Sequence, residues 1–286
     1  MVLQSQGLKY SGDRAMAAPQ IDIIIPVLDD LRILETIESV RYFDDIDAVR
    51  LVIMAGASSE TFLEQVRPAL LPHDILSTEP DAGIFDALNM GLDLCTAPIL
   101  GWLGGDDVFT GQVRASDVVG EFAVMDAGIL VYSTEYHRDN RITRRLGARW
   151  SKKSLIPWGF HNPHFSTFLA QSVYSKSRFP ISTTKRNLFS DIIYFANMIT
   201  AHDVTLRETV CTYMAEGGSA SGTLNSVKYN FRQRYWFYKG RFGLANGVVA
   251  PVMCLLWKLA SVVQYKLFPK TCAPLWQAAG ADPKGS

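Results

Sequence analysis

The chain has 286 residues, of which 48% are hydrophobic and 20% are charged, and its formal net charge is zero. This composition excludes a disordered polymer, and the length suffices for one large domain or for a domain with an appendage. Cys95, Cys211, Cys254 and Cys272 show no metal-binding spacing, so we expect reduced thiols in a cytoplasmic protein. Residues 1–19 lack the apolar core of a secretory signal, and we expect a flexible leader there.

The zero net charge conceals an uneven distribution along the chain. Residues 226–286 contain nine Lys or Arg and one Asp, a net charge of +8, so residues 1–225 carry −8. The same segment holds 11 of the 32 aromatic residues. A basic, aromatic segment favours an anionic partner surface. We therefore divide the chain into a core of residues 20–225 and a helical extension of residues 226–286.

The first part of the core alternates apolar runs with helical periodicity. Buried strands are predicted at Ile21–Val27, Val49–Met54, Ile75–Thr78 and Pro98–Leu103. Helices are predicted between them at Leu31–Phe43, Thr61–Leu71 and Ile84–Leu94, with Asp29 or Asp30 as the N-cap of the first. This alternation predicts an α/β fold with a mostly parallel sheet flanked by helices.

Two adjacent carboxylates follow the fourth predicted strand, in Gly104-Gly105-Asp106-Asp107. Ligands of open α/β sheets bind beyond the carboxyl ends of the strands. Two carboxylates placed there repel each other, so a cation should share the site. A hard divalent ion with a phosphate-bearing substrate meets this need. An Asp pair that caps a turn is the alternative interpretation.

The sequence of the second part of the core predicts further helices and strands. We expect a helix at Gln112–Met125 and an antiparallel hairpin of strands Ile129–Tyr136 and Arg141–Trp150. A helix at Asn187–Met198 and a strand at Thr209–Ala215 complete it.

A motif of twelve residues resembles a known family. Pro80-Asp81, Gly83-Ile84, Asp86-Ala87, Asn89 and Gly91, followed by an apolar strand and Asp106-Asp107, resemble the nucleotide-sugar site of family 2 glycosyltransferases of the bacterial surface-polysaccharide type. The resemblance implies a GT-A, Rossmann-like fold. It also implies inverting transfer of a sugar from a nucleoside diphosphate sugar, in the first place a UDP-sugar, to a hydroxyl of a lipid-linked or nascent surface glycan.

The resemblance also implies residue roles. Asp107 and Asp106 would hold Mn²⁺ or Mg²⁺, and Asp191 would be the general base. The implied donor-binding residues are Pro26, Asp29, Asp81, Gly83, Asp86, Asn89, Asp106 and His164. Glu216-Gly217-Gly218-Ser219 resembles a loop that closes over the diphosphate.

Each of these residues also has an ordinary structural interpretation. Asp191 and Asp86 could be helix N-terminal acids, and His164 a structural histidine. The sequence departs from the family pattern at Ala55, where an acidic residue is usual, at Ala82, where Lys is usual, and at Phe165, where Gln is usual.

Two other functions therefore stay open. One is a catalytically silent sugar-binding or scaffolding relative, which the departures favour. The other is a sugar-phosphate nucleotidyltransferase, although Pro26–Leu31 contains no glycine for a phosphate loop.

The extension predicts two helices, separated near residues 240–247. Its uncharged run Phe242–Trp257 is shorter than the ~20 residues of a membrane span. We expect interfacial attachment to an anionic membrane, on the inner face of the cell membrane. Helices that cover the sheet or form a homodimer are the alternatives. We expect no nucleic-acid partner.

Overall fold

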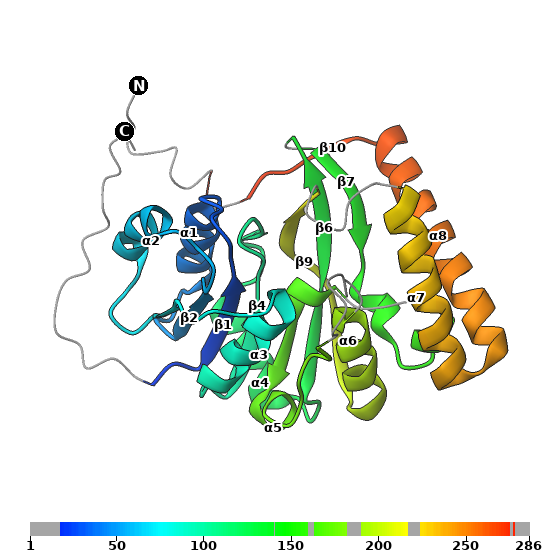
Figure 1. Ribbon diagram of the computed structural model, residues 1–286, viewed down its shortest axis with the longest axis horizontal. Helices are drawn as coiled ribbons and strands as arrows, with labels where there is room; N and C mark the ends of the chain where they lie inside the picture. The colour runs from blue at the N-terminus through cyan, green and yellow to red at the C-terminus, as the bar shows by residue number, and fades with distance from the viewer. Residues whose placement is uncertain are drawn as a thin grey trace.

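The computed structural model describes residues 18–139, 141–159, 163–181, 190–216, 224–274 and 277. A ten-stranded sheet forms its centre, with the order β10-β7-β6-β8-β4-β1-β2-β3, while β5 and β9 pair off this path (Figure 1). The strands are β1 Ile21–Pro26, β2 Val49–Met54, β3 Ile75–Ser77, β4 Ile99–Trp102, β5 Val108–Phe109, β6 Ile129–Arg138, β7 Arg141–Leu146, β8 Thr167–Ala170, β9 Val204–Ala215 and β10 Lys270–Thr271. The helices are α1 Ile33–Phe43, α2 Glu60–Val66, α3 Ile84–Leu94, α4 Ala115–Val124, α5 Gln171–Tyr174, α6 Ser190–Ala201, α7 Leu224–Phe242 and α8 Leu244–Leu267.

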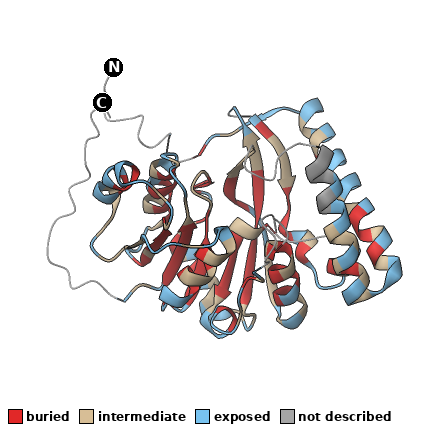
Figure 2. Ribbon diagram, in the orientation of Figure 1, coloured by how far each residue is buried: buried red, intermediate tan, exposed pale blue. Residues whose placement is uncertain are grey.

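The parallel part of the sheet is buried on both faces, as its continuous apolar strands predict. Strand β1 lies between β2 and β4 and is parallel to both. Side chains alternate across it, so Ile23 belongs to the core cluster that includes residues of α1, α2 and α4, while Ile24 belongs to the cluster that includes residues of α3, α5 and α6. Figure 2 shows the buried strands between helices whose outer faces are exposed. The predicted α/β fold is therefore confirmed.

The second part of the sheet is mixed. Strand β6 pairs antiparallel with β7 and β8 and parallel with β9. The predicted hairpin is present, but its second strand ends at Leu146 and the chain continues in a 3₁₀ turn, Ala148–Ser151. The sequence analysis missed β5, β8 and β10, because strands of two to four residues show little periodicity.

The loop after β1 corrects one sequence prediction. Asp29 does not cap α1. The N-cap position is taken by Arg32, which has no side-chain cap, and Asp30 caps the turn before it by accepting the N–H of Arg32 at 3.1 Å. Asp29 has a left-handed backbone, with φ of 48°, which aspartate tolerates. Its carboxylate instead accepts hydrogen bonds from the backbone N–H and the hydroxyl of Ser59, the N-cap of α2. The first loop is thereby fastened to the second.

Helices α7 and α8 form an antiparallel hairpin that packs beside β7 (Figure 1). Only Gly243, with φ of 96°, separates them, which corrects the wider break predicted from sequence. The α8 residue Ser261 meets the Arg145 backbone of β7. Helix α8 has 24 residues, more than its uncharged run suggested, and by length and composition it could cross a membrane.

Candidate active site

The carboxyl ends of β1, β4, β6 and β9 lie at one edge of the sheet. Strand β1 is parallel to β4, β6 is parallel to β9, and β8 is antiparallel to both β4 and β6, so all four strands run in the same direction. The loop after β1 reaches the loop after β4, since a Cβ on Gly105 would lie 3.0 Å from Val27. Pro26, which ends β1, therefore borders the turn that carries Asp106 and Asp107. This edge is where ligands of α/β proteins bind.

Asp107 is buried, with 3% of its surface exposed. Its carboxylate accepts hydrogen bonds from the backbone N–H of Gly104, at 3.2 Å, and of Ala215, at 3.0 Å. A Cβ at position 104 would lie 2.5 Å from the carboxylate, so any larger residue there would displace Asp107. Burial, followed by the charge of Asp106, raises the pKa of Asp107 to about 8.

Asp106 is half-buried and forms an ion pair with Arg32, at 3.0 Å between Nη1 and Oδ2. Arg32 also holds Asp30 through Nε, at 2.9 Å and 3.0 Å from the two carboxylate oxygens. The sequence analysis missed Arg32. Only its spacing of two from Asp30 hinted at a pairing, and nothing in the sequence connects it to Asp106.

The Asp106–Asp107 pair fits a divalent cation that is shared with a diphosphate. Within the described ranges, no group of three or more His, Cys, Asp or Glu side chains could hold a metal. A closed protein site is therefore not present in this part of the chain. Mg²⁺ characteristically binds through one or two carboxylates, substrate phosphates and water. A buried carboxyl that keeps its proton near neutral pH can also lose that proton when a cation binds to it.

The predicted donor motif at the start of α3 forms a compact turn. Asp81 accepts a hydrogen bond from the N–H of Gly83, and Asp86 accepts one from the N–H of Ala82. Gly83 has φ of 127°, a conformation that favours glycine. Asn89 lies farther along α3 and exchanges two hydrogen bonds with the backbone of Phe179, so its amide fastens α3 to the segment before α6.

His164 and Asp191 come together, although they are 27 positions apart in the sequence. His164 Nδ1 lies 3.1 Å from Asp191 Oδ2, in the first turn of α6. The His164 ring stacks on Phe195 at 4.7 Å, and its backbone carbonyl accepts a 2.6 Å hydrogen bond from Trp102. Since Trp102 ends β4, the same strand supports this pair and leads into the Asp106–Asp107 turn. The sequence analysis missed Trp102.

Some predicted features lie outside the described residues. These are Gly217, Gly218 and Ser219 of the predicted closing loop, the start of the Asn187–Met198 helix, and most of the leader. The closing loop's first residue is described. Glu216 follows Ala215, the partner of Asp107, and is held by Arg144 at 3.1 Å. Ala55, at the usually acidic position, is buried and donates its N–H to Ser77.

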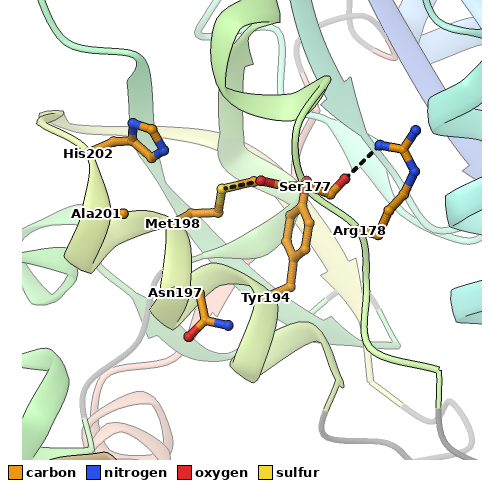
Figure 3. A pocket seen from close by; sticks show the side chains of 7 residues that line it. All are labelled: Ser177, Arg178, Tyr194, Asn197, Met198, Ala201 and His202. Carbon is orange, nitrogen blue, oxygen red and sulfur yellow. Dashed lines mark hydrogen bonds between the residues drawn. The ribbon is translucent and has the colours of Figure 1, made fainter.

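A cavity of about 210 Å³ lies beside α6. Figure 3 shows its lining side chains, among them Tyr194, Asn197 and Arg178. None of the predicted site residues lines it, so we do not assign it to the active site.

Comparison with known proteins agrees with this fold. The fold is that of the GT-A glycosyltransferases. Staphylococcus aureus TarS, solved as residues 1–349 with UDP-GlcNAc, superposes with a TM-score of 0.54 and 12% identity over 84% of this chain and 73% of that one. The mannosyltransferase PcManGT from Pyrobaculum calidifontis, solved with GDP-Man and Mn²⁺, superposes with a TM-score of 0.51 and 16% identity. The superposition covers 93% of this chain and 80% of that one.

The model of the family "Glycosyl transferase family 2" matches residues 22–190. The chain belongs to this family, which confirms the resemblance found in the sequence. Curated relatives from Mycobacterium bovis and Mycobacterium tuberculosis, each named "PGL/p-HBAD biosynthesis glycosyltransferase", are 28% identical over 145 residues. The match covers 46% of this chain and 57% of each relative, so the chain matches little more than half of their length.

Proposed function

We propose that the chain is an inverting glycosyltransferase that moves a sugar from a nucleoside diphosphate sugar, most simply a UDP-sugar, to a hydroxyl of a lipid-linked or nascent surface glycan. The buried Asp107 beside Asp106, at the carboxyl end of β4, carries the proposal. Among the described residues, the one ion-pair partner of this acidic pair is the exposed Arg32, so the site suits a cation and a diphosphate together. UDP-GlcNAc and GDP-Man in the neighbours are consistent with such a donor.

Each residue of the candidate site would have its own role in binding the donor or the metal. Pro26 and Asp29 would face the base and ribose, and the turn of Asp81, Gly83 and Asp86 would border the donor. Asp106 and Asp107 would hold Mn²⁺ or Mg²⁺, which when bound offsets charge on the leaving diphosphate. Asn89 would fix the neighbouring segment, through its two hydrogen bonds to Phe179.

Asp191 would take the proton from the acceptor hydroxyl. As that oxygen forms its bond to C1 of the sugar, the bond from C1 to the diphosphate oxygen breaks, and the diphosphate leaves with the electron pair. Attack from the opposite face inverts the anomeric centre. His164, 3.1 Å from Asp191, would orient the carboxylate toward the acceptor.

A donor screen tests this function. The melting temperature of the whole chain would be measured with UDP-, GDP- and other nucleotide sugars, with Mn²⁺ and with EDTA. We expect one donor to raise the melting temperature in Mn²⁺ but not in EDTA. The chain should transfer sugar to a glycan acceptor from that donor and not from the others. Binding without any transfer would indicate the catalytically silent relative. Full activity in EDTA would exclude the metal.

We also propose that the chain works at the cytoplasmic surface of an anionic membrane. One face of α8 is exposed and apolar over its whole length, with residues spaced as on one side of a helix. We call this face the α8 stripe, and its members are Leu244, Val248, Val252, Leu255, Leu256, Leu259, Val263 and Leu267. Residues 224–274 contain eight Lys or Arg and no Asp or Glu. An apolar stripe on a helical hairpin that carries Lys and Arg but no Asp or Glu suits the interface of an anionic bilayer.

Replacing Leu255, Leu256 and Leu259 together by serine tests the stripe. All three are about half exposed, so the fold should tolerate the change. We expect affinity for anionic liposomes to fall about tenfold or more, because each leucine loses apolar burial in the bilayer. Val124→Ser, at an exposed site on α4, is the control and should bind as the unchanged chain does. A chain that ignores anionic liposomes at low salt, or forms a dimer through α8, would refute membrane contact.

A further inference from the structure

Arg32 lies between two acidic loops of the candidate active site. One guanidinium nitrogen, Nη1, lies 3.0 Å from Asp106 Oδ2, and Nε and Nη2 hold Asp30. The arginine side chain is 58% exposed, so most of it faces solvent rather than packed neighbours. Its contacts are therefore set by charge, and the side chain can change partners without disturbing the core.

Arg32 is the main counter-charge of the acidic pair. Within the part of the chain that the structure describes, Asp106 has no other ion-pair partner, and Asp107 has none. The groups bonded to Asp107 are the neutral N–H groups of Gly104 and Ala215. The nearby ring of His137 adds little, since burial lowers its pKa and keeps it neutral at pH 7.

This arrangement creates a conflict when a divalent cation binds. Arg32 occupies one oxygen of Asp106 and so competes with a cation for this carboxylate, and two positive charges so close repel each other. A diphosphate that arrives with the cation offers the guanidinium a different partner, because Arg binds phosphate oxygens in a bidentate manner.

We propose that Arg32 is a displaceable counter-ion, which holds Asp106 until the metal and the donor bind and then turns to the diphosphate. This inference rests on the proposed function, since it assumes a metal and a nucleotide at this site. It makes Arg32 a positioning residue that couples the two ligands. Metal alone should bind weakly, metal with nucleotide should bind tightly, and each should strengthen the other by the same factor.

The test measures Mn²⁺ binding to the whole chain by electron paramagnetic resonance, first with Mn²⁺ alone and then with UDP or GDP added. For Arg32→Gln we expect Mn²⁺ alone to bind about tenfold tighter, because a competing cation is gone. We expect the gain in affinity from nucleotide to shrink by a similar factor, because the diphosphate loses its arginine. Arg32→Lys keeps the charge and should keep the weak binding of Mn²⁺ alone.

Arg67→Gln is the matched control. Arg67 is also exposed and paired with a nearby acidic residue, Glu60, but it lies at the end of α2. It should leave both affinities unchanged. The opposite signs of the two Arg32→Gln effects separate this role from a structural one, which would weaken both.

Two results would overturn the inference. One is unchanged or weaker binding of Mn²⁺ alone in Arg32→Gln, and the other is an undiminished gain from nucleotide. Failure of the proposed function looks different, since the unchanged chain would then bind no Mn²⁺ even with UDP or GDP present.

Discussion

Asp107→Asn is expected to lower sugar transfer by about 10³-fold or more, the largest effect of any single change in this chain. The substitution keeps the shape of the side chain and removes the charge that would hold the cation. The metal is worth several kcal/mol of charge stabilisation at the leaving diphosphate, and each 1.36 kcal/mol is tenfold in rate. Steady-state transfer, measured with the donor found in the screen, checks this expectation.

The same substitution should keep the fold and remove a pH dependence from its stability without metal. Burial raises the pKa of Asp107 to about 8 in the folded chain, against about 4 in the unfolded chain. The folded state therefore keeps its proton longer, and the metal-free free energy of unfolding should fall as pH rises from about 4 to 8. Asn cannot ionise, so this fall should be absent. In EDTA the melting temperature of the unchanged chain should therefore fall relative to that of the variant as pH rises from about 4 to 8.

An exposed carboxylate provides the control. Asp203 pairs with Lys153 at the surface, so Asp203→Asn should change neither transfer nor the pH dependence of melting. If Asp107→Asn kept its activity, the buried carboxylate would have only a structural role in tying β4 to the end of β9.

Asp191→Asn is expected to lower transfer by about 10²-fold or more, while the affinity for the donor stays nearly unchanged. A positioned general base contributes this much by accepting a proton in the transition state, and Asn cannot accept one. The contact with His164, 3.1 Å away, can persist with the amide, so the start of α6 should keep its place. The rate constant of the bound complex and the donor dissociation constant should be measured separately.

The two measurements distinguish catalysis from structure at Asp191. A variant that loses donor affinity but keeps its rate when saturated would show that Asp191 only holds His164 and α6 in place. Asp191→Glu keeps a carboxylate and serves as the conservative variant. It should recover part of the lost rate. Replacement of His164 by Ala should lower the rate less than Asp191→Asn, because His164 orients the carboxylate and takes no proton from the acceptor.

The sequence by itself determined the parallel half of the fold and the location of the acidic pair. Continuous runs such as Ile21–Val27 are short and rich in β-branched residues, which favours buried strands between helices, and Asp106-Asp107 follows such a strand directly. Local patterns decide these features, because strand and helix periods depend on neighbours in the chain. The family resemblance added Asp191 and His164 by their motifs.

Only the tertiary structure decided which groups surround those carboxylates. Asp29 looked like a cap for the next helix, yet it binds Ser59 at the start of α2. Arg32 reaches Asp106 from the loop after β1, and Ala215 donates to Asp107 from the end of β9. These contacts join residues far apart in sequence. The distance between them in space is fixed by the register and order of the strands. A pattern in one stretch of sequence contains no information about that order, so the charge balance of the site became visible only in the folded chain.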